Sequence, residues 1–311
     1  MCGIIGIYGL NKDKNSRLNQ VKQLTSSLLH RGPDGWGYYI SPQIGFGQTR
    51  LSIVDLSTGD QPMKSGKYVI VFNGEIYNYI ELKDKLRKSG ITFQTTSDTE
   101  VLLKAFEHWG TKCFSLLNGQ FAVLIWDTEK EILTIARDRF GIRPLYLLEF
   151  QKNIYFSSEL KAFDQIEGYQ REYDFKRLYE HALFWNTYGD HTVYKNIKSL
   201  PGGTFTIFSR GKIIQQNKFY EIGSECRING NSLNKVTDEF KELMDDSVKL
   251  RLRSDVPVGA YLSGGIDSSV ILHLIRNHNK KHFKTFSVTF SDQEYDESEY
   301  PLIPAQQLIQ F

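Results

Sequence analysis

The chain has 311 residues, of which 40% are hydrophobic and 24% are charged, a composition typical of a globular protein large enough for two domains. Its 38 basic and 36 acidic residues leave a formal net charge of +2, which gives no electrostatic reason to expect a nucleic acid or an anionic membrane as a partner. The three cysteines, Cys2, Cys113 and Cys226, are odd in number and far apart, which argues against a disulfide framework or a structural zinc site and favours a reducing cytoplasm.

The opening segment, MCGIIGIYGL, is apolar for only ten residues and has no basic stretch before it, so it predicts neither a signal peptide nor a membrane span. Short apolar runs bounded by turn residues follow, and they predict antiparallel strands over Ile4 to Tyr8, Ile44 to Gln48, Tyr68 to Phe72, Ala122 to Asp127, Ile132 to Arg137 and Ile154 to Ser157. Apolar residues at helical spacing predict helices over Leu18 to Leu29 and Asp98 to Trp109. We therefore expect residues 1–220 to form a layered α+β domain rather than a pure sandwich.

Residues 221–232 (EIGSECRINGNS) have no periodicity and contain two glycines, so we expect a linker there. The remaining residues, 233–311, have the pattern of a parallel α/β sheet that has just begun. An apolar stripe from Leu233 to Val248 predicts an amphipathic helix. After it we expect a strand, a glycine-containing loop, a helix and a second strand over Val256 to Leu262, Ser263 to Ser269, Val270 to His278 and Thr285 to Phe290.

The chain stops at Phe311, inside a further predicted helix that starts at Ile303 and carries no capping residue. We therefore expect the second domain to be incomplete. Because one βαβ unit cannot bury both faces of a parallel sheet, we also expect this polypeptide to bind ATP weakly.

Cys2 is the first residue with a chemical signature. Its small side chain favours removal of Met1, which leaves a thiol and a free α-amine on one residue. Their usual pKa values, about 8.5 and about 7.7 to 8.0, are close enough for the amine to accept the thiol's proton near neutral pH. The alternative is an inert cysteine packed at the start of a strand.

Further motifs accompany Cys2 in a characteristic order. They are CGIIGIYG at the start, then His30 to Asp34, Arg50 to Asp55, Phe72 to Asn78, Ser97 to Glu100, Arg137 to Tyr146 and Ser157 to Lys161. In order and spacing this series resembles the class II glutamine amidotransferases. The resemblance implies the α+β layered sandwich of N-terminal-nucleophile hydrolases, with two antiparallel sheets and covering helices.

The resemblance also implies a role for particular residues. Cys2 is expected to attack the side-chain amide of glutamine, with the side chain of Asn73 and the backbone N–H of Gly74 as oxyanion donors. The residues expected to bind glutamine are Arg50, Ile53, Asn73, Gly74, Glu75 and Asp98. Three residues inside the motifs, Arg31, Asp34 and Asp55, have a simpler account as turn and ion-pair residues and stay outside the catalytic set.

Each of these residues also has a purely structural alternative. Asn73-Gly74 is a strong signal for a type I′ hairpin turn. Arg50 can be an exposed arginine at a strand end, and Asp98 can cap the helix that follows it. The chemical argument for the last two is that an arginine fork suits the α-carboxylate of glutamine and an acid suits its α-ammonium group.

The loop SGGIDSS, Ser263 to Ser269, is expected between a strand and a helix, where backbone N–H groups and the helix N-terminus can hold phosphate. The alternative is an ordinary turn in which Asp267, Ser268 or Ser269 caps the helix. The complete SGGxDSS pattern resembles the pyrophosphate loop of ATP pyrophosphatases. It has no Walker A lysine, which implies an adenylating enzyme rather than a kinase.

An N-terminal cysteine amidotransferase joined to such a loop resembles glutamine-hydrolysing asparagine synthetase. That family activates aspartate as β-aspartyl-AMP, and ammonia then displaces AMP. The resemblance implies ATP and magnesium, with Asp267 as a magnesium partner and an ATP site made of Leu262, Ser263, Gly264, Gly265, Asp267, Ser268, Ser269 and Val288. For Leu262 and Val288 the strand-core reading holds as well, and the acidic run from Asp292 to Glu299 matches a family segment but suits a solvated loop better.

The expected partners are therefore glutamine, aspartate and ATP, with no nucleic acid and no membrane, and a homodimer is left open. Sugar-phosphate and phosphoribosyl amidotransferases have no reason to carry SGGIDSS, and relatives that build β-lactam rings have a disabled first site. A paralogue that amidates a uronic acid, a glutaminase-only protein and a non-catalytic regulatory module remain alternatives. From the order of the parts, we expect glutamine hydrolysis by this polypeptide without ATP-dependent asparagine formation.

Overall fold

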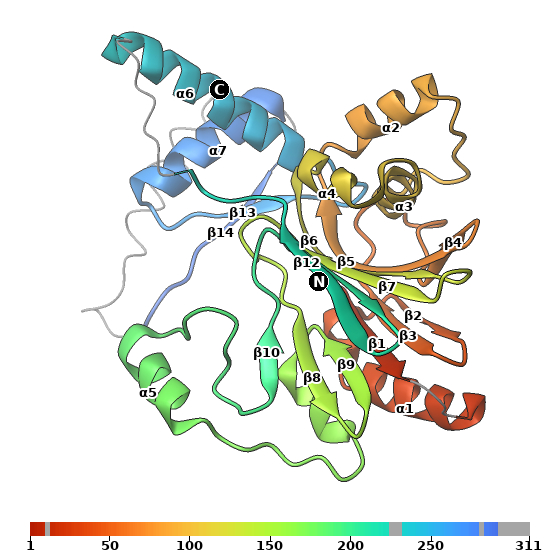
Figure 1. The fold of residues 1–311 in the computed structure, drawn as a ribbon. Coiled ribbons are helices and arrows are strands. Elements are labelled where there is room, and N and C mark those ends of the chain that lie inside the picture. Colours follow the sequence, from red (N-terminus) through yellow and green to blue (C-terminus); the bar gives the residue numbers. More distant parts are fainter. Residues whose placement is uncertain (10–12, 224–231, 280–282, 292–311) are drawn as a thin grey trace. The chain divides into compact units, whose positions relative to one another are not determined.

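The computed structural model describes residues 1–9, 13–223, 232–279 and 283–291 (Figure 1). Contacts between residues divide the chain into two compact units, Met1–Gly223 and Ser224–Phe311. Most of the predicted linker, the acidic run and the predicted helix from Ile303 to Phe311 lie outside the described residues.

The first unit contains two antiparallel sheets of six strands each. The first sheet has the order β10 (Ile197–Ser199), β8 (Tyr146–Phe150), β9 (Asn153–Ser157), β1 (Gly3–Gly9), β3 (Ile44–Arg50) and β2 (Gly35–Ile40). The second sheet has the order β12 (Lys212–Lys218), β11 (Thr204–Ser209), β7 (Ile132–Arg137), β6 (Gly119–Asp127), β5 (Tyr68–Ile76) and β4 (Met63–Ser65).

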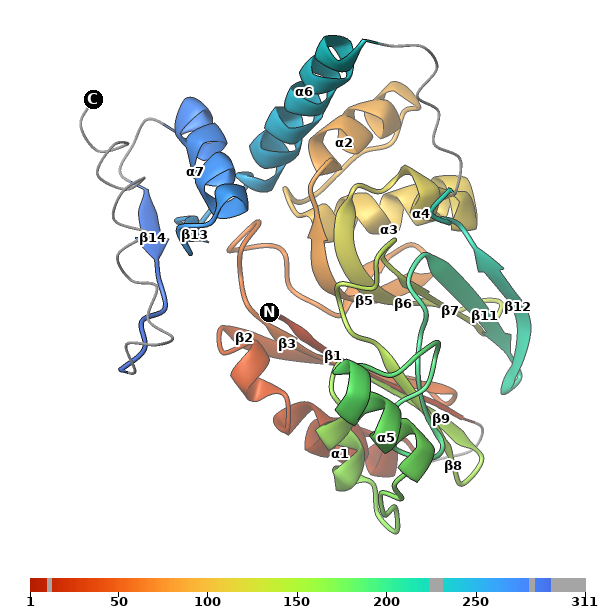
Figure 2. The same cartoon turned by 90° about the vertical axis from the view of Figure 1, so that its left-hand side faces the viewer.

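Helices cover the outer face of each sheet (Figures 1 and 2). Helix α1 (Lys14–Ser26) and the 3-10 helix η3 (Leu160–Gln165) pack on the first sheet. Helices α2 (Tyr79–Lys88), α3 (Asp98–Trp109) and α4 (Cys113–Leu116) pack on the second. The remaining elements of this unit are two short 3-10 helices and one exposed helix, η1 (Leu29–Arg31), η2 (Gly110–Lys112) and α5 (Phe175–Phe184).

The core of this unit consists of three apolar layers. In β5, Val69 and Val71 face the first sheet, whereas Ile70 and Phe72 face helices α2 to α4. Because both faces of the strand are covered, its sequence is continuously apolar rather than alternating. A helix–sheet–sheet–helix sandwich results, which confirms the α+β N-terminal-nucleophile architecture expected from the sequence.

The hairpin alternative for Asn73-Gly74 is wrong, because β5 continues through both residues to Ile76 and pairs with β6 along its length. Gly74 has φ of +159°, and a Cβ atom there would lie 2.0 Å from the carbonyl oxygen of Gln120. Glycine is therefore needed because the neighbouring strand approaches closely, not because the chain turns.

The sequence predicted β1, β3, β5, β6, β7 and β9 but missed β2, β4, β8, β10, β11 and β12, and its helix predictions were uneven as well. Helix α1 begins at Lys14, four residues before the expected start at Leu18, because the Asp13 carboxylate accepts hydrogen bonds from the N–H groups of Asn15 and Ser16, both at 3.1 Å. The sequence did not predict α2 or α5. Its prediction for α3, Asp98 to Trp109, matches the structure at both ends.

The second unit contains α6 (Leu233–Arg251), β13 (Gly259–Tyr261), α7 (Ile266–His278) and β14 (Lys284–Phe286). Strands β13 and β14 are parallel, with Gly259 opposite Lys284, and α7 connects them. The expected βαβ unit of an α/β domain is thus present, with strands shorter than predicted.

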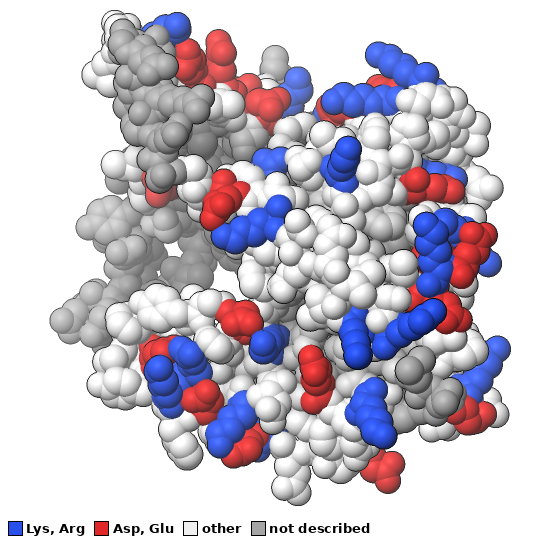
Figure 3. Space-filling model, viewed as in Figure 1, with Lys and Arg blue, Asp and Glu red and all other residues white. Residues whose placement is uncertain are grey.

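Charges are mixed on the face of the molecule shown in Figure 3, where lysine and arginine alternate with aspartate and glutamate. Within the described ranges, no helix is both long enough and apolar enough to cross a membrane.

Candidate active site

A pocket in the first unit contains every residue for which the sequence predicted a role with glutamine. The space between its walls, its open mouth and the solvent there included, is about 480 Å³. The predicted residues that line it are Cys2, Arg50, Ile53, Asn73, Gly74, Glu75 and Asp98. They come from the start of β1, the end of β3, the loop after it, β5 and the start of α3, so only the fold brings them together.

Strand register places Cys2 in this pocket. Gly3 pairs with Thr49 in the antiparallel ladder, so Cys2 lies beside the residues that follow β3. The backbone N–H of Leu51 donates to the Cys2 sulfur at 3.4 Å, and the thiol lies 3.6 Å from the Leu51 carbonyl oxygen. The thiol is therefore held at the pocket wall by backbone groups.

The electrostatics of the pocket shift the pKa values of the thiol and the terminal amine in opposite directions, each toward its uncharged form. Burial raises the pKa of the Cys2 thiol, although the hydrogen bond from Leu51 and the nearby amine and Arg143 lower it. Burial lowers the pKa of the terminal amine, which belongs to Met1 in this structure, and the charges of Arg31 and Arg143 lower it further. A lowered amine pKa favours the neutral amine that can act as a base.

The side chain of Asn73 is buried in the pocket wall. It is fully buried, and within the described ranges neither the oxygen nor the nitrogen of its amide has a hydrogen-bond partner. An unpaired buried amide is costly, so such groups call for an explanation. A ligand in the pocket that Asn73 lines provides one.

Arg50 is not the exposed strand-end arginine that the alternative required, since it is 8% exposed. One guanidinium nitrogen, Nη1, donates to Asp60 at 2.7 Å and to the Leu56 carbonyl at 3.5 Å. The other, Nη2, donates to the Asp55 carbonyl. These contacts fix the plane of the guanidinium group at the pocket wall.

Asp98 does not cap α3, because that role belongs to Ser97, whose hydroxyl accepts from the Thr99 N–H at 3.1 Å. The Asp98 carboxylate instead accepts a hydrogen bond from the Ile76 N–H at 3.0 Å. Burial, reinforced by the nearby Glu75 charge, raises the pKa of Asp98 to about 7, and the hydrogen bond from Ile76 offsets part of this effect. A buried acid beside a cationic group of a ligand would become ionised.

Arg143 lines the pocket and was not predicted as a site residue. Its Nη2 atom lies 3.8 Å from Oε1 of Glu75. Burial raises the pKa of Glu75, while Arg143 and the terminal amine lower it. The buried Asp138 carboxylate accepts a hydrogen bond from the Arg143 backbone N–H at 2.9 Å. The only signal in the sequence was the position of Arg143 inside the motif from Arg137 to Tyr146.

Other pocket residues were also missed. They are Met1, Leu51, Val54, Gly59, Gln61, Phe72, Ser97 and Thr99. Most of them flank a predicted residue in the chain, so adjacency to a motif was the only available signal.

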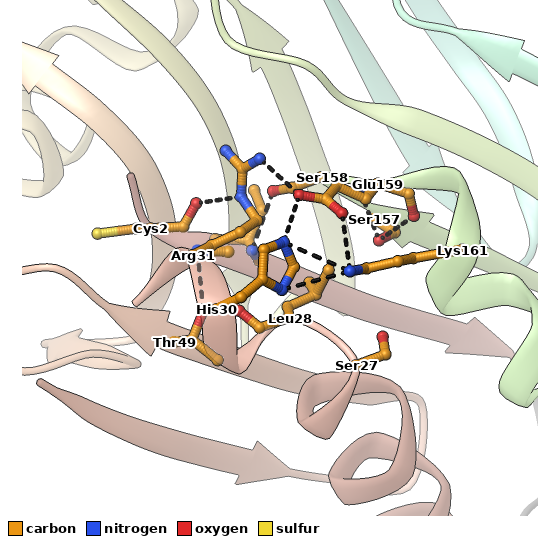
Figure 4. A network of polar contacts seen from close by, with 12 residues as sticks. Cys2, Ser27, Leu28, His30, Arg31, Thr49, Ser157, Ser158, Glu159 and Lys161 are labelled. Carbon is orange, nitrogen blue, oxygen red and sulfur yellow. Dashed lines mark hydrogen bonds and ion pairs between the residues drawn. The ribbon is translucent and has the colours of Figure 1, made fainter. Parts of the chain in front are cut away.

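The three motif residues left outside the catalytic set have turn and ion-pair contacts. Asp34 accepts a hydrogen bond from the Ser52 N–H at 2.8 Å, and Asp55 accepts one from the Thr58 N–H at 2.7 Å. Arg31 pairs with Glu159 at 2.8 Å, and it also donates to the carbonyl oxygen of Cys2 at 2.9 Å (Figure 4).

In the second unit, the segment between β13 and α7 is shorter than the predicted loop from Ser263 to Ser269, because α7 begins at Ile266 and not at Val270 as predicted. Gly264 has φ of +81°, a conformation that favours glycine. The cap of α7 is Gly265, without a side-chain hydrogen bond, so the alternative of a cap by Asp267, Ser268 or Ser269 is wrong. The Ser268 and Ser269 hydroxyls instead donate to the Gly265 carbonyl, at 3.1 Å and 2.8 Å.

Leu262 and Val288 follow the two parallel strands. Leu262 is buried, and its N–H donates to the Phe286 carbonyl at 2.9 Å. Val288 is 65% exposed, so the strand-core account fails for this residue. Asp267 is exposed in the first turn of α7, and within the described ranges no group of three or more histidine, cysteine, aspartate or glutamate side chains forms a metal site.

Family models match both units of the chain. The model of the glutamine amidotransferase domain matches residues 1–220, and that of asparagine synthase matches residues 239–308.

Among curated proteins, the chain is similar to asparagine synthetase [glutamine-hydrolyzing] 1 of Bacillus subtilis (strain 168), with 39% identity over 96% of this chain and 47% of that protein. It is 34% identical to putative asparagine synthetase [glutamine-hydrolyzing] 2 of Methanocaldococcus jannaschii, over 96% of this chain and 62% of that protein. The chain thus spans about half the length of the curated relatives it matches, between 47% and 62% for these two.

Among solved structures, the chain resembles glutamine phosphoribosylpyrophosphate amidotransferase from B. subtilis. The TM-score is 0.52 at 18% identity, over 91% of this chain and 65% of that one. At this identity the likeness concerns the fold alone.

Proposed function

The chain belongs to the glutamine amidotransferase domain family, and from this membership we propose that its first unit hydrolyses glutamine to glutamate and ammonia at Cys2. The observation that carries the proposal is the convergence of Cys2, Arg50, Asn73 and Asp98 on one pocket from separate segments of the chain. Each supplies a group that the reaction needs.

The nucleophile and the base come from one residue. After removal of Met1, the α-amine of Cys2 accepts the thiol proton while the sulfur attacks the side-chain amide carbon of glutamine. The carbon–nitrogen bond of the resulting tetrahedral intermediate breaks, and the nitrogen leaves as ammonia with the proton returned by the amine. Water then attacks the thioester, which releases glutamate and restores the thiol.

Asn73 and Gly74 support the tetrahedral intermediates. The unpaired amide of Asn73 is available to donate to the oxyanion, together with the backbone N–H of Gly74. The pocket position of both residues beside Cys2 supports this assignment.

The α-groups of glutamine require an anion site and a cation site. The fixed guanidinium plane of Arg50 suits the α-carboxylate, and the buried Asp98 carboxylate, with Glu75 near it, suits the α-ammonium group. Ile53 lines the same pocket as an apolar contact for the methylene groups.

For the second unit we propose a role in the ATP-dependent half of an asparagine synthesis. There, aspartate would react with ATP to give β-aspartyl-AMP and pyrophosphate, and ammonia from the first unit would displace AMP. The match of residues 239–308 to asparagine synthase supports this proposal, as do the names of the curated relatives. The division that we propose is 1–220 for the glutaminase domain, 221–232 for the linker and 233–311 for part of the ATP-dependent domain.

ATP would lie against Val288 and the segment from Leu262 to Ser269, which includes the first turn of α7, where backbone N–H groups and the N-terminus of the helix can face phosphates. A single exposed carboxylate in the first turn of α7, that of Asp267, fits a magnesium ion that takes its other ligands from phosphate and water. Bound magnesium would offset the negative charge of the phosphates.

The partners that we propose are thus glutamine, aspartate and ATP in the cytoplasm. The near-neutral net charge of +2 supports small molecules rather than nucleic acids or membrane surfaces. The comparisons do not favour the uronic-acid paralogue, the glutaminase-only protein or the regulatory module. A homodimer stays a prediction, which light scattering on the purified chain would test.

The test is an assay of the purified chain with glutamine, followed by addition of ATP, magnesium and aspartate. Glutamate and ammonia in equal amounts, lost in Cys2→Ala, are the result expected for the first unit. Pyrophosphate and asparagine are measured separately in the second stage. No ammonia from a folded chain that lacks Met1 would contradict the proposal.

A further inference from the structure

The segment from the last residue of β9, Ser157, to Lys161 contacts the beginning of β1, and the proposed reaction assigns this segment no role. Ser158 makes two hydrogen bonds with the backbone of Ile4. Its N–H donates to the Ile4 carbonyl at 3.1 Å, and its hydroxyl accepts from the Ile4 N–H at 3.0 Å. These contacts fix β1 two residues after the nucleophile.

Arg31 extends this contact to the nucleophile itself (Figure 4). Its Nη1 atom donates to Glu159 at 2.8 Å, and its Nε atom donates to the carbonyl oxygen of Cys2 at 2.9 Å. The arginine side chain is only 8% exposed. Because one guanidinium group makes both bonds, the position of the Glu159 carboxylate determines where the arginine holds Cys2.

Neighbouring residues fix both the backbone and the carboxylate of Glu159. Its N–H donates to the Ser157 hydroxyl at 3.1 Å, and that hydroxyl donates back to the Glu159 carbonyl at 2.8 Å. His30 lies 2.9 Å and Lys161 3.5 Å from the carboxylate. Burial raises the pKa of Glu159, but the hydrogen bonds and charges of Arg31 and His30 outweigh it and keep the acid ionised.

We propose that Glu159 is a positioning residue for glutamine hydrolysis, which acts through Arg31 to fix the backbone carbonyl of Cys2. The inference rests on the proposed function at Cys2. An N-terminal residue has no preceding peptide bond to hold it, so it is prone to fray unless its other backbone groups are fixed. Arg31 donates a hydrogen bond to the Cys2 carbonyl oxygen. This bond limits rotation of the Cys2 thiol and amine away from the pocket.

The expected consequence is a loss in rate rather than in binding. Arg50 and Asp98, which we assign to the α-groups of glutamine, do not contact the 157–161 segment in any hydrogen bond between described residues. A displacement of a reacting group by about 1 Å can lower a rate by about 10². Loss of Glu159 should therefore lower kcat and leave KM nearly unchanged.

The test compares Glu159→Ala and Glu159→Gln with Glu180→Gln. The control removes a glutamate of similar burial that pairs with Arg177 at 2.6 Å on α5, far in the chain from Cys2. For each purified chain we would measure kcat and KM for glutamine, the rate of Cys2 alkylation by iodoacetamide, and Tm.

We expect kcat to fall by about 10- to 100-fold in Glu159→Ala, with KM within about twofold, and less in Glu159→Gln, whose amide oxygen can still accept from Arg31. Alkylation of Cys2 should become several-fold faster, because the residue is less restrained. Glu180→Gln should leave kcat and alkylation unchanged.

An unchanged kcat and alkylation rate in a folded Glu159→Ala chain would overturn the inference. A loss of kcat/KM that comes entirely from a higher KM would overturn it too. Ammonia release by the unmodified chain tests the proposed function separately. If that release is missing but alkylation still responds to Glu159, the proposed function fails and the positioning contact stands.

Discussion

The backbone N–H of Ile76 donates a hydrogen bond to the carboxylate of Asp98 at 3.0 Å. This contact joins the start of α3 to the end of β5, just after Asn73 and Gly74. It keeps a buried acid in the wall of the pocket, where burial raises its pKa to about 7. Two consequences can be measured, one on activity and one on stability.

The value of kcat/KM for glutamine should fall as the pH drops below about 7, because protonated Asp98 cannot pair with the α-ammonium group. The thiol and the amine also titrate, so glutaramate, which lacks the α-ammonium group, serves as the reference substrate. The ratio of kcat/KM for glutamine to that for glutaramate should fall about tenfold per pH unit below this point. A ratio independent of pH would remove Asp98 from glutamine binding.

Asp98→Asn should stabilise the ligand-free protein at neutral and higher pH. The folded pKa, about 7, lies above the usual 3.8, so the contribution of Asp98 to stability is full below pH 3.8 and is lost as the pH rises to about 7. The Tm difference between Asp98→Asn and the unmodified chain should therefore grow between about pH 4 and about pH 8. Asp84→Asn, an exposed carboxylate on α2, should show no such trend.

Cys2→Ala should abolish ammonia release and leave the fold intact, since the reaction has no other nucleophile. Cys113→Ala, at a buried cysteine whose thiol pKa is strongly raised by burial, is the matched control and should remain active. Intact-mass measurement tests the base: active protein should lack Met1. Full activity in chains that retain Met1 would contradict the role of the α-amine.

Arg50→Lys should raise the KM for glutamine at least tenfold, because a point-like ammonium group cannot form the two parallel hydrogen bonds of a guanidinium group. The substitution also loses contacts to the loop that contains Asp60. Asp60→Asn weakens that loop contact, 2.7 Å long, and leaves the guanidinium group in place, so it separates the two effects. If Arg50→Lys and Asp60→Asn had equal KM values, Arg50 would be a residue that holds the loop and not one that binds substrate.

Asn73→Ala should lower kcat by about 10² to 10³ with little loss in Tm. The reason for the small change in stability is that no partner of the Asn73 amide is lost within the described ranges. Gln61→Ala should lower Tm by contrast. The Gln61 amide accepts a hydrogen bond from the Phe72 N–H at 2.6 Å and donates one to Thr99 at 3.2 Å, and both are lost. Loss of Tm without loss of kcat in Asn73→Ala would indicate a structural residue instead.

The sequence by itself predicted half of the strands of the first unit and a set of residues for the site. Apolar runs located β1, β3, β5, β6, β7 and β9, which are largely buried, whereas the other six strands, among them the exposed β12, were missed. Ordered motifs predicted Cys2, Arg50, Asn73 and Asp98 as a set, and the structure places all four at one pocket.

Only the tertiary structure decided which polar groups meet. Arg31 and Glu159 are 128 residues apart, and Ile76 and Asp98 are 22 residues apart, so no local pattern reports either contact. For the same reason Arg143 was missed in the pocket, and the sequence did not show that Ser97 rather than Asp98 caps α3. Propensity and periodicity report the burial of single elements, whereas hydrogen bonds across the pocket depend on how the two sheets and α3 pack.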